Sequence, residues 1–169
     1  MEKPSPFTKR ETGFLEELER NRVRFMIVGL SAAALQGAPV VTQDIDLWFE
    51  NLKSPGIGKA LKKVGGVFVH PIGLNPPMFA GDGVNLFDVV VTMHGLNGFA
   101  DEWNHTIDVR FGKVKVKVLE LDRIIKSKEA VRRPKDLLVL PVLRDALKIV
   151  QAVSRSEKIK SRKNKSHSP

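Results

Sequence analysis

The chain has 169 residues, a length that suits one domain, and 42% of them are hydrophobic, which is enough for a core. It contains no Cys, so disulfides and thiolate metal sites are excluded. The net charge is +9, from 28 Lys and Arg against 19 Asp and Glu, and such an excess attracts polyanions. No apolar stretch approaches the roughly 20 residues that span a bilayer, and the first residues lack the apolar core of a signal peptide. We therefore expect a soluble, cytoplasmic protein that has no membrane partner.

The first half of the chain mixes helices and strands after a polar arm, residues 1–10, that we expect to be flexible. Apolar periodicity predicts, in chain order, a helix at 11–21, a strand at 24–28, a helix at 31–35, a strand at 45–49, a helix at 57–64 and a strand at 67–69. Gly29 ends the first of these strands, and Ser31 is the predicted N-cap of the short helix. The pattern is that of a sheet combined with helices.

The second half begins with a loop rich in Pro and Gly, predicted over residues 71–85. The elements predicted after it are a strand at 86–91, a helical turn at 99–104, hairpin strands at 106–110 and 113–118, a helix at 121–128 and a mostly helical segment at 134–153. Pro141 should interrupt the last helix, because proline lacks the backbone N–H. Residues 154–169 are predicted to be a disordered basic tail. Residues 11–153 would then form a single domain of the α/β (α+β) class, with a mixed β-sheet flanked by helices.

Three carboxylates have the spacing and surroundings of a metal site. Asp44 and Asp46 are two residues apart on a predicted strand, about 6–7 Å along it, so both side chains point to one face. Asp88 interrupts the apolar run over residues 86–91, where a charge is costly unless a metal or partner compensates it. Together they could hold Mg²⁺ ions that bridge triphosphate oxygens. The alternatives are solubilising charges for Asp44 and Asp46, and a loop-capping role for Asp88.

The segment before these carboxylates has the features of a phosphate site. Gly29 ends a buried strand and lets the backbone approach a ligand closely. The helix that follows offers free N–H groups at its N-terminus, and Ser31 lies there. A strand, a glycine turn and a short helix therefore precede the first two carboxylates.

Taken together, residues 28–47 resemble the Gly-(Gly/Ser) and Asp-x-Asp signature of the DNA polymerase beta superfamily of nucleotidyltransferases. The similarity continues in order through residues 87–89, 98–103, 127–128 and 133–137, and it covers about residues 23–150. The chain is most similar to the small stand-alone prokaryotic form, the minimal nucleotidyltransferase or AbiEii-like domain. This resemblance implies the nucleotidyltransferase fold and transfer of a nucleoside monophosphate from an NTP to a hydroxyl by a two-Mg mechanism.

The resemblance also implies roles for individual residues. Asp44, Asp46 and Asp88 would be catalytic and would hold two Mg²⁺ (or Mn²⁺) ions, with Asp88 taking the proton of the attacking hydroxyl. The residues implied to contact the nucleotide and its phosphates are Gly29, Ser31, Thr42, Lys128 and Lys135. For the two lysines, the alternative is a solvated helix surface.

Two departures from the family pattern leave a second function open. Leu30 stands where relatives usually have another small residue, and Val40 lies near a position that is often basic. They favour a catalytically weak nucleotide-binding or toxin–antitoxin regulatory module that contacts a partner protein. The acceptor stays open among RNA, protein and small molecules, because a fold does not select a substrate. A third hypothesis is nucleic-acid binding through the basic residues of 155–169.

Overall fold

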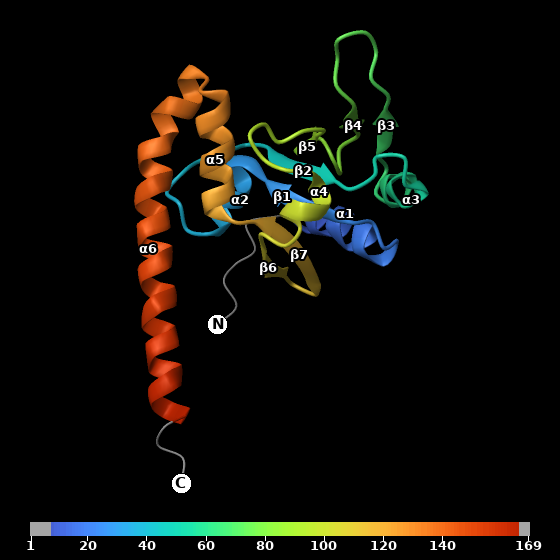
Figure 1. The fold of residues 1–169 in the computed structure, drawn as a ribbon. Helices are drawn as coiled ribbons and strands as arrows, with labels where there is room; N and C mark the ends of the chain where they lie inside the picture. The colour runs from blue at the N-terminus through green and yellow to red at the C-terminus, as the bar shows by residue number, and fades with distance from the viewer. Residues whose placement is uncertain (1–7, 166–169) are drawn as a thin grey trace.

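The computed structural model describes residues 8–165, and its helices and strands alternate along the chain (Figure 1). Six elements are helical: α1 (Lys9–Arg20), α2 (Gly29–Leu35), α3 (Pro55–Lys63), α4 (Phe99–Glu102), α5 (Leu121–Val131) and α6 (Pro134–Lys165). Seven are strands: β1 (Phe25–Val28), β2 (Ile45–Phe49), β3 (Val67–Val69), β4 (Met78–Ala80), β5 (Phe87–Val90), β6 (Thr106–Phe111) and β7 (Val114–Leu119). Nearly every predicted helix and strand is therefore present, within a few residues of its predicted ends.

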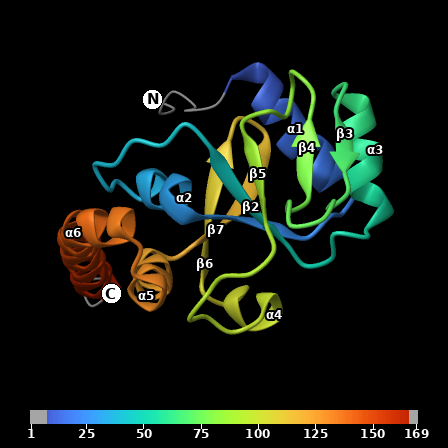
Figure 2. The ribbon, with the colours of Figure 1, turned by 90° about the horizontal axis from the view of Figure 1, so that it is seen from above.

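Five strands form one mixed sheet in the order β5-β2-β1-β7-β6. The central strand β1 runs antiparallel to β2 and parallel to β7, and β2 runs parallel to β5. The hairpin of β6 and β7 closes one edge, as predicted. Helices pack around the sheet, with α2, α5 and α6 on one side and α1 and α3 on the other in Figure 2. The predicted mixed sheet flanked by helices is confirmed.

The core lies along β1 and the helix that covers it. Met26, Ile27 and Val28 are fully buried, and the apolar face of α1 contributes Phe14 and Leu15, which are also fully buried. Burying each such side chain stabilises the fold by about 1.5–3 kcal/mol. The strand that carries the glycine turn is thus anchored on both faces, which holds its end in one position.

At the N-terminus, the prediction of a flexible arm is wrong for residues 8–10, which form the start of α1. Residues 1–7 lie outside the described residues, but Thr8 is the N-cap of α1, and Lys9 and Arg10 belong to the helix. The Thr8 hydroxyl accepts a hydrogen bond from the Glu11 N–H, and the Glu11 carboxylate accepts one from the Thr8 N–H at 2.7 Å. The spacing Thr8-x-x-Glu11 is the sequence signature of such a capping box.

At the C-terminus, the predicted interruption at Pro141 and the predicted disordered tail are wrong. Helix α6 is 32 residues long, runs through Pro141 and includes residues 154–165. Residues 166–169 lie outside the described residues. The physical reason is helix propensity: residues 142–165 contain neither Gly nor Pro, and eight of these 24 residues are Lys or Arg, which favour helices. Figure 1 shows α6 extending well past the sheet. Within residues 8–165 no helix, including α6, is long and apolar enough to cross a membrane.

The predicted loop over residues 71–85 contains a strand. Met78–Ala80 form β4, which pairs antiparallel with β3 in a separate two-stranded sheet. Phe79 anchors it, because the ring is buried and lies with its centroid 5.4 Å from that of Phe14. Three residues between Pro77 and Gly81 are too few to give a strand signal of their own. Tertiary packing of Phe79 therefore decides this element.

Candidate active site

The predicted carboxylates meet at one end of the sheet. Asp46 of β2 and Asp88 of β5 are paired residues on adjacent parallel strands, so their side chains lie side by side on one face. On its other side Asp46 pairs with Val28, the last residue of β1. Asp44 precedes β2 by one residue, and its charge acts on both other carboxyls. Residues from three separate parts of the chain therefore converge next to the turn that follows β1.

That turn is built so closely around Asp46 that only glycine fits. Gly29 has φ of +65°, a left-handed conformation that glycine adopts without steric cost. A Cβ atom on Gly29 would lie 2.0 Å from Oδ2 of Asp46 and 2.9 Å from its Cγ. The glycine was expected to admit a ligand, and the structure shows that its nearest neighbour is the Asp46 carboxylate itself.

Ser31 has a different role from the predicted N-cap. Val28 occupies the N-cap position of α2 and makes no side-chain cap hydrogen bond. The buried Ser31 hydroxyl donates a hydrogen bond to the Val28 carbonyl at 2.9 Å and accepts one from the Asp46 N–H at 3.3 Å. Ser31 therefore ties the first turn of α2 to the backbone of Asp46, and its single hydroxyl proton is already in use.

The electrostatics of the cluster favour a bound cation. Burial first, and then the charges of Asp88 and Asp44, raise the pKa of Asp46 from 3.8 to about 6. Burial and Asp44 also raise the pKa of Asp88. None of the three carboxylates makes a hydrogen bond or ion pair with any residue in the described part of the chain. Three neighbouring carboxylates that lack an ion-pair partner among the described residues are a donor set that suits Mg²⁺.

The side chains are not already closed around an ion. Across residues 8–163, no three His, Cys, Asp or Glu side chains are placed tightly enough to hold a metal. The donor chemistry of Asp44, Asp46 and Asp88 thus fits a divalent cation, while their rotamers would have to close around it. The paired backbone register of Asp46 and Asp88 makes that closure a side-chain movement.

Comparisons with known proteins identify the fold. No family model and no curated protein sequence matches the chain. Its structure superposes on the solution structure of the antibiotic-resistance factor ANT(2'')-Ia with a TM-score of 0.56 at 13% identity, over 94% of this chain and 96% of that one. The crystal structure of ANT(2'')-Ia in complex with adenylyl-2''-tobramycin gives a TM-score of 0.55 at 14% identity, over 87% and 95%.

A third solved structure is similar as well. An antigenic nucleotidyltransferase-like protein from Paracoccidioides brasiliensis gives a TM-score of 0.50 at 14% identity, over 94% of this chain and 93% of that one. The chain has the nucleotidyltransferase fold. At these identities the likeness concerns the fold, and it confirms the fold that the resemblance implied. The AbiEii-like subgroup stays a prediction.

In this nucleotidyltransferase fold, both predicted lysines lie within electrostatic reach of the carboxylates. The charges of Lys128 and Lys135 each oppose the rise in the pKa of Asp46. Lys135 is exposed in the first turn of α6, whereas the side chain of Lys128 is only 17% exposed. Lys128 Nζ donates a hydrogen bond to Oδ1 of Asp136 at 2.8 Å. Lys128 is therefore a held, mostly buried cation and not a solvated surface lysine.

Sequence reasoning missed Asp136 as a partner of this site. It is buried in the first turn of α6, eight residues after Lys128 and across a break between two helices. Helix α5 ends at Arg132, which has φ of +55°, so the chain reverses and brings α6 back against α5. The available signal was an acidic residue just after Pro134, a position where acids stabilise helix N-termini.

The loop before β2 and the two departures from the family pattern have structural roles. Thr42 Oγ1 donates a hydrogen bond to the Asp44 carbonyl at 3.1 Å, so it shapes the turn that presents Asp44. Leu30 and Val40 are half-buried and pack against the core. The side chain of Leu30 is thus accommodated by the protein, although it lies in the first turn of α2, next to Gly29.

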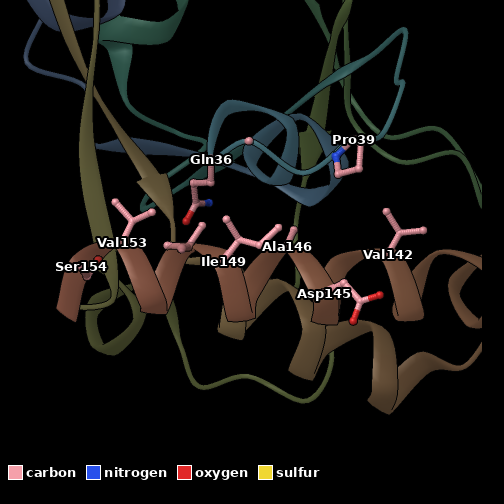
Figure 3. A pocket seen from close by; sticks show the side chains of 10 residues that line it. Gln36, Pro39, Val142, Asp145, Ala146, Ile149, Val153 and Ser154 are labelled. Carbon is pink, nitrogen blue, oxygen red and sulfur yellow. The ribbon is translucent and has the colours of Figure 1, made fainter. Parts of the chain in front are cut away.

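A separate hollow lies between α6 and the end of α2 (Figure 3). It measures about 530 Å³ and its wall is mostly apolar, with Val142, Ala146 and Ile149 on α6 facing Gln36 and Pro39. The Gln36 amide is fully engaged, because it bonds the backbones of Ala32, Leu119 and Leu121. None of the predicted site residues lines this hollow, so it is distinct from the carboxylate site.

Proposed function

We propose that this protein transfers a nucleoside monophosphate from an NTP to a hydroxyl group of an acceptor and releases pyrophosphate. The observation that carries the proposal is the pairing of Asp46 with Asp88 beside Gly29, in a nucleotidyltransferase fold. Burial first, and then the like charges of Asp88 and Asp44, raise the pKa of Asp46 to about 6. Such a perturbed group next to other carboxylates is characteristic of a functional site.

In this proposal Asp44, Asp46 and Asp88 would hold two Mg²⁺ (or Mn²⁺) ions. When bound, the metal would neutralise triphosphate oxygens and charge that develops on pyrophosphate. Asp46 is the most rigidly placed of the three, because β1 and β5 flank its backbone and Ser31 binds its N–H. Asp46 would therefore need the least backbone movement to hold a metal ion.

The remaining chemistry falls to residues of the chain. Asp88 would orient the acceptor hydroxyl and accept its proton, while the hydroxyl oxygen forms a bond to the α-phosphorus. The bond from the α-phosphorus to the oxygen shared with the β-phosphate breaks, and pyrophosphate leaves. The raised pKa of Asp88 suits a proton acceptor. Gly29, Lys128 and Lys135 would position the phosphates, and the two lysines would offset the charge of the leaving group. Ser31 and Thr42 would support the site indirectly, through their hydrogen bonds to the backbone of Asp46 and Asp44.

A transfer assay tests this function. The protein is incubated with α-labelled ATP, CTP, GTP and UTP, Mg²⁺ and one acceptor class at a time: RNA, a protein extract, or small molecules that include tobramycin. Tobramycin is included because a solved structure of this fold contains adenylyl-2''-tobramycin. We expect one class to be labelled by the wild type and not by Asp46→Asn. Equal labelling by the two proteins, or none with any acceptor, would contradict the proposal.

A second candidate is a regulatory module that binds an NTP without turning it over, as in a toxin–antitoxin pair with a partner protein. It is favoured by Leu30, which lies in the first turn of α2 beside Gly29. Calorimetry with Mg²⁺ and each NTP distinguishes the two candidates. Binding with no labelled product would support the module, and labelled product would exclude it.

A further inference from the structure

A buried ion pair of Lys128 with Asp136 lies next to the carboxylate site, and the proposed chemistry gives no role to its acid. Oδ1 of Asp136 accepts a hydrogen bond from Lys128 Nζ at 2.8 Å, and Oδ2 accepts one from the Arg133 N–H at 3.2 Å. The side chains of Asp136 and Lys128 are only 6% and 17% exposed. Burial alone would raise the pKa of Asp136, but the hydrogen bond and charge of Lys128 and the Arg133 N–H lower it. The Asp136 carboxylate is therefore ionised at neutral pH.

The geometry of the helix break makes this pair specific. Lys128 belongs to the last turn of α5, and Asp136 to the first turn of α6. The left-handed Arg132 between them turns the chain so that α6 packs back along α5. Because one oxygen of Asp136 caps the start of α6, only the other remains for the ammonium group. Lys128 is thus held by a carboxylate in the first turn of α6.

Two groups of carboxylates compete for the ammonium group of Lys128: Asp136, and the cluster that contains Asp46. Lys128 acts on the charge of Asp46, yet no salt bridge joins Lys128 to Asp44, Asp46 or Asp88 in the described part of the chain. A lysine side chain is long and flexible, and fixing it costs up to about 2 kcal/mol of conformational entropy. Without Asp136, the ammonium group would be drawn onto the unpaired carboxylates, where it would compete with a divalent cation.

We propose that Asp136 is a positioning residue that holds Lys128 beside the carboxylate cluster but off it, so that the ammonium binds triphosphate while the carboxylates stay free for metal. This inference rests on the proposed function. It makes the α5–α6 junction part of the nucleotide site, although Asp136 itself touches neither substrate nor metal. On the nucleotide Asp136 acts only through Lys128, so the effects of changing the two residues on nucleotide affinity must coincide and not add.

Two measurements test the inference. The first follows the lysine ammonium groups by NMR, with the Lys128 signal assigned from its loss in Lys128→Gln. We expect a protected Lys128 signal in the wild type and in Asp145→Asn, whose pair with Lys148 on α6 is exposed, and loss of that signal in Asp136→Asn. A Lys128 signal that is unprotected in the wild type, or unchanged in Asp136→Asn, would overturn the positioning role whatever the protein does with nucleotides.

The second measurement is the affinity for inorganic tripolyphosphate in the presence of Mg²⁺, by calorimetry. We expect Asp136→Asn and Lys128→Gln each to weaken this affinity at least about tenfold. The double variant, which leaves no unpaired buried charge, should lose no more than either single variant. Wild-type affinity in Asp136→Asn, or additive losses in the double variant, would overturn the inference alone. No binding by the wild type would overturn the proposed function, and the inference with it.

Discussion

Gly29 and Asp46 lie so close together that there is no room between them for a Cβ atom on residue 29. That atom would lie 2.0 Å from Oδ2 of Asp46, and Gly29 also has φ of +65°. We expect Gly29→Ala to push the Asp46 carboxylate aside and to reduce transfer activity at least about 100-fold, because displaced catalytic groups have effects of that size. The measurement is the rate of labelled transfer.

Gly112 provides the matched control. It has φ of +57°, and a Cβ added there would meet nothing within 4 Å. Gly112→Ala therefore carries the same left-handed strain, about 1–2 kcal/mol, without touching the site. Equal loss of activity in the two alanine variants would show that strain, and not contact with Asp46, is responsible.

Asp46→Asn should stabilise the metal-free protein. The folded pKa of Asp46 is about 6, above its ordinary value of 3.8, so the native state binds the proton more tightly than the unfolded state does. Stability therefore falls as pH rises through this range, and at pH 7 the ionised carboxylate costs about 1–3 kcal/mol that the amide avoids. Denaturant unfolding should show the difference at pH 7 and little difference below pH 4.

The response to Mg²⁺ gives a second comparison between the stability of the wild type and that of Asp46→Asn. Millimolar Mg²⁺ should raise the melting temperature of the wild type and leave Asp46→Asn unchanged, because a ligand stabilises only the protein that binds it. If Asp46→Asn is less stable than the wild type at pH 7 without metal, that result would contradict the proposed repulsion among the carboxylates.

Asp88→Asn should separate catalysis from binding. If Asp88 takes the proton of the acceptor, its removal lowers turnover about 10²–10⁴-fold, the usual contribution of a general base. Affinity for Mg-NTP should fall less than in Asp46→Asn, because Asp46 is the more buried carboxylate and has the more strongly shifted pKa. Turnover follows from the labelled-transfer assay and affinity from calorimetry. Asp88→Asn with wild-type turnover would remove Asp88 from the mechanism.

Glu102 should be important for stability because its carboxylate is completely buried in an ion pair. Arg123 donates two hydrogen bonds to it, at 2.8 and 2.6 Å, and the Asn97 N–H donates a third at 3.1 Å. We expect Glu102→Gln to lower the free energy of unfolding by about 2–4 kcal/mol, since breaking a buried pair leaves a charge without its partner. Glu129→Gln, which breaks an exposed pair with Arg144, should cost less than about 1 kcal/mol.

The same pair gives a pH dependence with a definite sign. The hydrogen bond from Arg123, more than any other influence, holds the pKa of Glu102 below its ordinary value of 4.5. Its stabilising contribution is therefore complete above about pH 4.5 and is lost as pH falls through the folded pKa. In acid unfolding experiments the wild type and Glu102→Gln should converge; a constant difference at all pH values would exclude this linkage.

Deleting residues 155–169 should change polyanion binding and leave stability almost unchanged. The side chains of residues 151–163 are all exposed, so their removal should shift the melting temperature by less than about 2 °C. The deletion removes six basic residues: Arg155, Lys158, Lys160, Arg162, Lys163 and Lys165. If this part of α6 binds nucleic acid, affinity for RNA should fall steeply with salt and disappear on deletion. Deleting only residues 166–169 is the control, and RNA binding that survives the longer deletion would exclude the helix end.

The sequence by itself determined which residues could form the site. Alternation along a strand places Asp44 and Asp46 on one face, and an apolar run places Asp88 on a strand of the sheet, although its side chain is exposed in the structure. These are local properties with a spacing of a few residues, and the glycine turn and most helices and strands follow from the same kind of pattern. Where local signals conflicted, propensity and packing decided, as in the helical residues 154–165 and in β4.

Only the tertiary structure decided how these residues meet. The register that pairs Asp46 with Asp88 depends on β2 and β5 being neighbours in the sheet, which no local spacing specifies. The contact of Gly29 with Asp46 and the ion pair of Lys128 with Asp136 likewise join segments across a turn or a helix break. Strand order and helix packing are set by burial of the whole core, so the chemistry of the site was visible in the sequence while its geometry required the fold.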